Sequence, residues 1–290
     1  MTSVAHTGIF ERTIHETVAR VLLAIVWTCC VPTLVQGQEA DRIVATEVDG
    51  TLLRVRLASG KELSGVDLVG ATLSLALPGA SARPLVRVVS ITLDPNDPGR
   101  EVHLYRMASV DPRTGHAEEL CGEDAQGDRW AFPVQGQWDD EGNRLPGGGF
   151  TLVCSDGAVG KCVRFGYKPW KTHPDGTRLA DYHQACVRLV RADYCGGRGT
   201  TRDGMLIDLY DRLGIQQPAP NPEDQGLRFE AAWSPAGAVC VAHTRVPENI
   251  TLEQLATECP RLAGHLGAQA CTSPEDGIYD GEALLYNLSR

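Results

Sequence analysis

Residues 179–210 read LADYHQACVRLVRADYCGGRGTTRDGMLIDLY, a stretch that changes its pattern twice. In its first half, apolar or aromatic side chains recur at three- and four-residue intervals: Tyr182, Cys186, Leu189 and Val190. This period predicts an amphipathic helix from Leu179 to about Ala192. Closely spaced glycines then interrupt the pattern, and the run from Met205 to Tyr210 predicts a strand. A helix, a glycine-rich loop and a strand in succession indicate a mixed α/β region.

The sequence after this stretch predicts further short elements. Residues 229–243 predict a two-stranded hairpin that turns at Ser234-Pro235-Ala236-Gly237. Thr251 and Gln254 stand three residues apart before an apolar run, the pattern of a capping box at the start of a helix. We expect this helix to end at Cys259-Pro260, because proline cannot continue it.

The sequence before the stretch is typical of strands. Between Asp41 and about Leu120, short alternating runs such as Leu85–Ile91 are separated by turn residues, including the acidic turn Asp94–Gly99. The predicted fold class is therefore α+β, with an antiparallel β-rich N-terminal module over residues 38–120. A disulfide-stabilised mixed α/β region over residues 121–290 follows it.

The first 37 residues resemble a signal peptide. Val21–Val35 carries no charge, but it is shorter than the roughly 20 apolar residues that a spanning helix needs. Val35 and Gly37 fit the small-residue rule for cleavage after Gly37. We therefore expect an exported protein, periplasmic or extracellular, without a membrane span after processing. A retained anchor is the alternative, and translation from Val18 instead of Met1 would give a more basic start.

Ten cysteines occur in the chain, and two of them, Cys29 and Cys30, leave with this segment. The other eight are Cys121, Cys154, Cys162, Cys186, Cys195, Cys240, Cys259 and Cys271. An even number in an exported chain predicts disulfides, since these compartments are oxidising. Zinc is the competing explanation, but no Cys-x-x-Cys pair occurs. We expect no metal site, and the connectivity stays open.

The segment Ala192-Asp193-Tyr194-Cys195, followed by Thr201-Arg202-Asp203-Gly204, resembles the motif of the ADYC domain family. The segments Gly157–Arg164, Gly166–Trp170 and Phe229–Pro235 continue the likeness, which runs from about residue 85 to the C-terminus. The resemblance implies an exported bacterial protein without an established activity, so it assigns no catalytic residue and no cofactor.

A polar cluster around this motif raises the question of an enzyme. Its members are His183, Asp193, Asp203, Asp208 and Asp211. Carboxylates beside a histidine could perform acid–base chemistry, which makes a secreted hydrolase the alternative function. The competing interpretation is structural: loop carboxylates commonly accept backbone hydrogen bonds or pair with nearby arginines. We find no serine-nucleophile, dinucleotide or phosphate-loop pattern, and we favour a binding or structural module.

A compact basic and aromatic segment is the candidate ligand-binding surface. It contains Lys161, Arg164, Tyr167, Lys168 and Trp170, in a protein whose formal charge is −10. Rings beside cations can hold sugars or anionic polymers, so an envelope glycan or anionic polymer is a conceivable partner. The alternative is that the rings belong to the core and the lysine stems lie across it. The acidic balance argues against nucleic acid.

Overall fold

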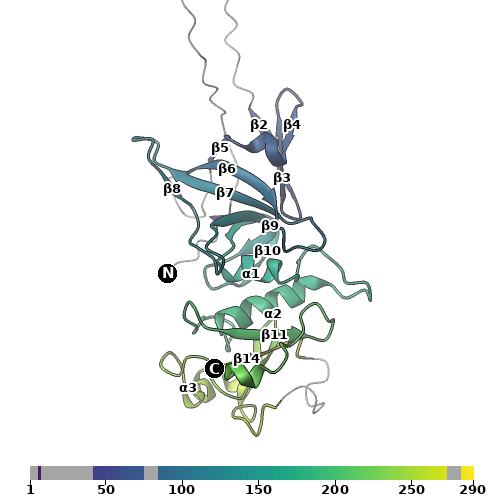
Figure 1. Ribbon diagram of the computed structural model, residues 1–290, viewed down its shortest axis with the longest axis vertical. Coiled ribbons are helices and arrows are strands. Elements are labelled where there is room, and N and C mark those ends of the chain that lie inside the picture. The colour runs from purple at the N-terminus through teal and green to yellow at the C-terminus, as the bar shows by residue number, and fades with distance from the viewer. Residues whose placement is uncertain (1–5, 8–41, 75–83, 273–281) are drawn as a thin grey trace, which may run out of the picture.

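The computed structural model describes residues 6–7, 42–74, 84–272 and 282–290. The predicted signal peptide lies outside the described residues, apart from His6–Thr7. The molecule is elongated, with a β-rich part at one end and a mixed α/β part at the other (Figure 1). Among the described residues, none of the helices is both long and apolar enough to cross a membrane.

The β-rich part consists of two antiparallel sheets. The larger has the strand order β1-β10-β9-β7-β6-β5, with β8 pairing with β7. Its strands are β1 (His6–Thr7), β5 (Thr72–Ser74), β6 (Leu85–Leu93), β7 (His103–Val110), β8 (Ala117–Glu119), β9 (Trp130–Trp138) and β10 (Arg144–Cys154). The smaller contains β2 (Ile43–Asp49), β3 (Leu52–Leu57) and β4 (Glu62–Ser64). The boundary that the sequence predicts at residue 120 thus falls within the larger sheet, since β9 and β10 continue it.

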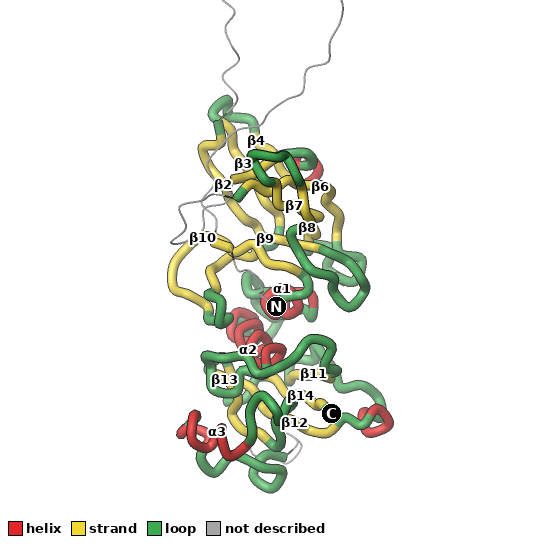
Figure 2. The backbone as a smooth tube through the Cα atoms, turned by 90° about the vertical axis from the view of Figure 1, so that its left-hand side faces the viewer, coloured by secondary structure: helices red, strands yellow, loops and turns green. Residues whose placement is uncertain are grey.

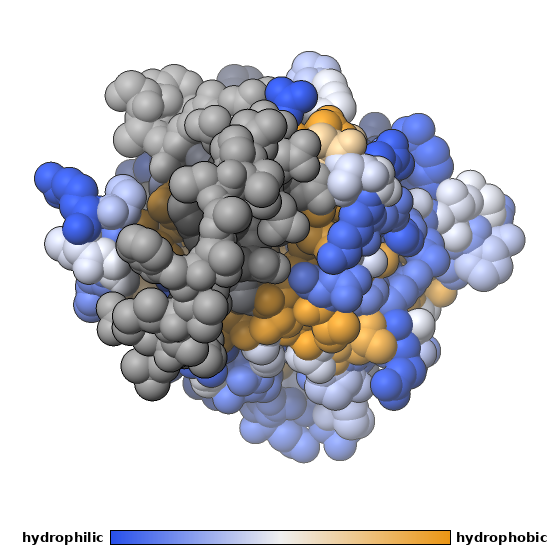
Figure 3. Space-filling view, turned by 90° about the horizontal axis from the view of Figure 1, so that it is seen from above, coloured by the Kyte–Doolittle hydropathy of each residue, from blue (hydrophilic) through white to orange (hydrophobic). Residues whose placement is uncertain are grey.

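One apolar core joins these two sheets. Leu53 and Val55 of β3 are buried against Val88, Tyr105 and Phe132 of the larger sheet. The Leu53 N–H donates to the Tyr105 hydroxyl at 2.9 Å, which satisfies two buried polar groups between the sheets. Seen from the end that carries β2–β4, apolar side chains gather among hydrophilic ones (Figure 3).

The α/β part contains a third antiparallel sheet with the order β11-β14-β12-β13. These strands are β11 (Ile207–Asp211), β12 (Arg228–Ser234), β13 (Gly237–Val241) and β14 (Leu285–Ser289). The α-helices are α1 (Ala158–Arg164), α2 (Leu179–Arg191) and α3 (Leu252–Glu258). Short 3₁₀ helices lie at Gly65–Leu68, Pro222–Gln225 and Pro260–Leu262. Both α1 and α2 lie between the β-rich part and this sheet (Figure 2).

The α+β fold class is confirmed, and so are the helix, the hairpin and the capping box that the sequence predicts. Helix α2 occupies Leu179–Arg191, one residue short of the predicted end. The hairpin β12–β13 turns at Ser234–Gly237, and the capping box of Thr251 and Gln254 begins α3. The predicted strand begins at Ile207 instead of Met205. Helix α1 was not predicted, because it is short and contains Gly160, where a Cβ would lie 2.2 Å from the Cys154 carbonyl oxygen.

All eight predicted cysteines form disulfides. The pairs are Cys121–Cys154, Cys162–Cys186, Cys195–Cys259 and Cys240–Cys271. The first closes a loop within the β-rich part, the second joins α1 to α2, and the third joins the loop after α2 to the end of α3. These bonds cross-link the elements that carry the family-like segments.

Candidate functional site

The Ala-Asp-Tyr-Cys segment begins where α2 ends. Ala192 has φ 48° and ψ 44°, a left-handed conformation that stops the helix. Its N–H donates to the Leu189 carbonyl, and the Asp193 N–H donates to that of Arg188. Ala192 is fully buried, so the segment turns within the core.

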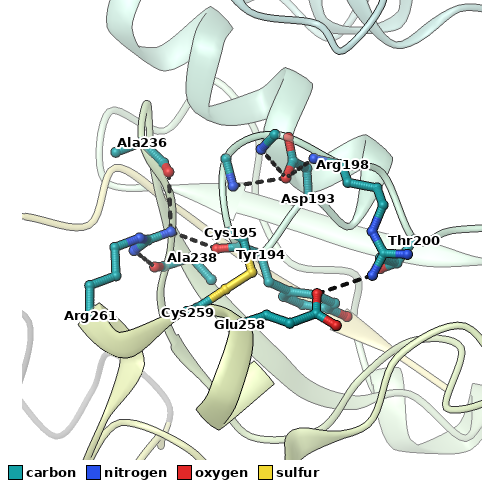
Figure 4. The surroundings of a disulfide bond; sticks show 12 residues. Asp193, Tyr194, Cys195, Arg198, Thr200, Ala236, Ala238, Glu258, Cys259 and Arg261 are labelled. Atoms are coloured by element: carbon teal, nitrogen blue, oxygen red, sulfur yellow. Dashed lines mark hydrogen bonds and ion pairs between the residues drawn. A yellow bond between two sulfur atoms is a disulfide. The ribbon is translucent and has the colours of Figure 1, made fainter. Parts of the chain in front are cut away.

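Asp193 organises the loop that follows. Its Oδ1 accepts hydrogen bonds from the N–H groups of Gly196, Gly197 and Arg198 at 2.8, 2.8 and 3.0 Å (Figure 4). Its Oδ2 accepts from Arg188 Nη1 at 2.6 Å, and both side chains are buried. The carboxylate is therefore fully engaged in holding the loop in place.

Tyr194 is the centre of a buried polar network. Its hydroxyl donates to Glu230 at 2.9 Å and accepts from the Arg245 N–H at 2.8 Å, while its ring stacks on Trp233. Burial raises the pKa of Tyr194 well above its usual value, and the Glu230 carboxylate adds to the shift. Burial alone would raise the pKa of Glu230. The Arg245 guanidinium, together with hydrogen bonds to the carboxylate, has a larger combined effect in the opposite direction, so the pKa of Glu230 is lower than usual.

Arg245 connects this network to helix α2. Its guanidinium pairs with Glu230 at 2.9 Å and donates to the carbonyls of Leu189 and Val190 at 2.9 and 3.1 Å. A helix C-terminus leaves such carbonyls without intrahelical partners, and a cation there is favourable. Asn287 of β14 completes the network by donating to Glu230 at 2.7 Å.

Cys195 links the motif to α3. Its disulfide with Cys259 brings the motif loop against Arg261, whose guanidinium donates to the carbonyls of Tyr194, Ala236 and Ala238 (Figure 4). Each residue of the motif thus has a structural role. Ala192 ends α2, Asp193 holds the following loop, Tyr194 joins the buried network and Cys195 is bonded to the end of α3.

A groove lies beside the motif loop. It has a volume of about 570 Å³ and lies between α1, the C-terminal end of α2 and the segment 199–207. Its charged lining residues are Asp156, Lys161, Arg191, Arg202, Asp203 and Arg245. Its apolar lining includes Phe165, Val190, Met205, Leu206 and Ile207. This volume falls within the range of about 300–1,000 Å³ that ligand sites occupy.

Some of the cationic side chains that line the groove form ion pairs and others do not. Arg245 is held by Glu230, and Arg202 pairs with Glu248 at the exposed rim. Within the described part of the chain, no ion pair or side-chain hydrogen bond engages Lys161 or Arg191. The Nε atom of Arg191 is buried without a hydrogen-bond partner. Buried polar atoms are normally satisfied, so Arg191 is a cation whose hydrogen-bonding capacity is not fully used by the described residues.

The profile of the ADYC domain matches residues 65–247, which is more than half of the chain. The chain belongs to the ADYC domain family. The match begins about twenty residues before the likeness seen in the sequence and ends before the C-terminus. No curated protein and no solved structure matches the chain.

The structure does not bring the polar cluster of this ADYC protein into one cleft. His183 is fully buried, and its Nε2 lies 3.1 Å from the Val159 carbonyl oxygen. Burial lowers the pKa of His183 to about 4. Eight residues of α2, or roughly 12 Å at the usual helical rise, separate His183 from the end of the helix at Arg191, and Asp193 lies beyond that end. Of the five residues of this polar cluster, Asp203 is the one that lines the groove.

The remaining carboxylates of the cluster, Asp208 and Asp211, accept hydrogen bonds from nearby loop and side-chain donors. Asp208 accepts a hydrogen bond from the Ala219 N–H at 2.9 Å. Asp211 accepts from the Tyr167 hydroxyl at 2.7 Å and from the Leu213 N–H at 2.6 Å. No group of three or more potential metal ligands occurs among the residues with described positions.

The basic and aromatic segment is divided by the structure. Arg164 pairs with Asp94 at 2.7 Å and Asp124 at 2.8 Å, and Lys168 pairs with Asp97 at 2.7 Å. These acids belong to the β-rich part, so both cations cross-link the two parts of the molecule.

Its aromatic members are also packed. Tyr167 is fully buried, and burial together with the Asp211 carboxylate raises its pKa. Trp170 is half-buried against the β-rich core, and a Cβ on Gly50 would lie 3.1 Å from its ring. Lys161 is the member of the predicted ligand-binding set that lines the groove. Sequence reasoning missed Asp156 and Arg191, because they become its neighbours only through the packing of α1 on α2.

Proposed function

We propose that this ADYC protein is an exported binding module that takes an acidic ligand, such as an envelope glycan or anionic polymer, in the groove beside the motif loop. The two cationic anchors are Lys161 of α1 and Arg191 of α2. The observation that carries the proposal is the contrast in pairing within the chain. Arg164 and Lys168 are neutralised by buried aspartates, whereas Lys161 and Arg191 line a groove without a partner among the described residues.

The chemistry of these two side chains favours an anion. A guanidinium presents a planar fork that matches a carboxylate or phosphate, while an ammonium acts as a compact point charge. Charge-assisted hydrogen bonds are about twice as strong as neutral ones. The protein as a whole carries a formal charge of −10, so an acidic ligand would be attracted by these local cations against the overall field.

The four disulfides support export. Disulfides persist in oxidising compartments and are rare in the cytosol, and pairing of all eight cysteines in this region fits a periplasmic or extracellular protein. The signal peptide expected over residues 1–37 would supply the route. N-terminal sequencing of exported material tests this, and we expect it to begin after Gly37. An intact Met1 would contradict the expectation.

A binding experiment tests the groove. Titration calorimetry of the disulfide-intact protein against soluble polygalacturonate and inorganic polyphosphate should detect binding to at least one polyanion. The double variant Lys161→Ala, Arg191→Ala should lose that binding by tenfold or more, about 1.4 kcal/mol or above. The matched control is Lys61→Ala, Arg113→Ala, which removes two exposed cations outside the groove.

Two results would contradict the proposal. One is the absence of binding to both polyanions by the wild-type protein. The other is equal affinity in the groove variant and its control, which would place any polyanion binding elsewhere on the surface. Thermal unfolding of both variants within a few degrees of wild type shows that the fold is intact.

A further inference from the structure

The groove carries carboxylates as well as cations. Asp156, just before α1, and Asp203, in the loop after the motif, both line it. Like Lys161 and Arg191, neither has a side-chain partner among the residues that the structure describes. The lining therefore offers unpaired groups of both signs, two cations and two anions.

This mixture disfavours a ligand that carries only negative charge. A polyphosphate or nucleic-acid strand would place phosphates beside Asp156 and Asp203, and like charges brought together at an interface weaken binding. A ligand with hydroxyl groups uses the same aspartates, because an ionised carboxylate is a hydrogen-bond acceptor. A ligand with acidic and hydroxyl groups therefore satisfies both the donors and the acceptors of the groove.

Phe165 adds an apolar surface between these charges. Phe165 is half-buried, packs against the α/β core and lines the groove, as Met205 does. An aromatic ring has large apolar faces that need no hydrogen-bond partner. The C–H face of a pyranose ring fits such a surface, while the hydroxyls at its edge reach the aspartates.

We propose that the ligand is an acidic saccharide of the uronic acid class, an inference that rests on the proposed binding function. Its carboxylate lies between the Lys161 ammonium and the Arg191 guanidinium, two cations of the groove lining that have no ion pair among the described residues. Its hydroxyls donate to Asp156 and Asp203. The sugar face packs on Phe165. The rim of the groove, formed by exposed Arg202, Asp203 and Gly204, leaves room for a chain to continue beyond it.

The test compares three probes with one full-length, disulfide-intact protein. These are an oligogalacturonate, a neutral malto-oligosaccharide of equal length, and inorganic polyphosphate, each titrated by calorimetry. We expect the oligogalacturonate to bind about tenfold or more tightly than either of the others. The variant Asp156→Ala, Asp203→Ala should weaken oligogalacturonate binding about tenfold and strengthen polyphosphate binding. The matched control Asp67→Ala, Asp140→Ala removes two exposed carboxylates outside the groove.

The outcomes separate this inference from the proposed function. Stronger binding of polyphosphate, still dependent on Lys161 and Arg191, would overturn the saccharide and leave the acidic-ligand module standing. Equal binding of the neutral oligosaccharide would overturn the role of the sugar carboxylate. Failure of every probe to bind would overturn both proposals. Unchanged oligogalacturonate affinity in the aspartate variant would overturn the hydroxyl contacts and, with them, the inference.

Discussion

Replacing Asp193 by alanine tests whether the family motif stabilises the fold. The change leaves Arg188 as a buried cation without its carboxylate, and it removes the acceptor of three backbone N–H groups. Breaking a buried ion pair costs about 3–5 kcal/mol. Arg188 keeps two acceptors, Asn143 Oδ1 and the Pro235 carbonyl, so the lower end applies. We expect a loss of about 3 kcal/mol, or roughly 6–12 °C in Tm for a chain of this size.

The assay is urea unfolding of the oxidised protein, followed by tryptophan fluorescence. Asp203→Ala is the matched control, because Asp203 is an exposed aspartate in the same loop without a partner among the described residues. Such surface changes cost about 0.5 kcal/mol or less. A value for Asp193→Ala equal to that of Asp203→Ala would refute the reasoning. The motif aspartate would then need a functional explanation instead of a structural one.

Three further changes probe the core around the motif. Burial lowers the pKa of His183 from 6.5 to about 4, so between these pH values the unfolded chain binds a proton at His183 and the folded protein does not. The free energy of unfolding should therefore fall by about 3 kcal/mol as the pH drops from 6.5 to 4. The variant His183→Gln should remove that part of the acid sensitivity in urea titrations. Replacing both Cys195 and Cys259 by alanine should cost about 4 kcal/mol by loop entropy, measurable as a lower urea midpoint; an unchanged midpoint would contradict this. Tyr194→Phe deprives Glu230 of a buried donor and should cost about 1–3 kcal/mol in the same assay, while no loss would argue against the network.

The elements that the sequence predicted are those whose signals are local. Helix α2 follows from apolar spacing within thirteen residues, and the capping box needs only Thr251 and Gln254. Helix α1 lacked such a signal, since its interior glycine lowers helix propensity. Gly160 is required there by the close approach of the Cys154 carbonyl, a contact that depends on the packing of α1 against β10.

The candidate site was predictable only in fragments, because its partners are distant in sequence. The basic segment suggested an open cationic surface, yet Arg164 pairs with Asp94 and Lys168 with Asp97, each about seventy residues earlier in the chain. Those acids lie in a turn whose composition indicated nothing beyond a chain reversal. Lys161 has no ion pair among the described residues, because it lies at the groove between α1, α2 and the loop after the motif. Eight cysteines likewise predicted disulfides but not their pairing, which depends on the tertiary fold.

The structure separates the residues that define the family from those that could bind a ligand, yet it also connects them. The loop after the motif is fixed at its start by Asp193 and further along by Thr200, which donates to the Ala192 carbonyl at 2.7 Å. Three residues later the same loop supplies Asp203 to the groove. The motif therefore positions one wall of the groove, although none of its four residues lines the groove. It follows that Asp193→Ala should weaken binding at the groove even at temperatures where the variant is folded, whereas Tyr194→Phe, which leaves the loop hydrogen bonds intact, should alter stability more than affinity.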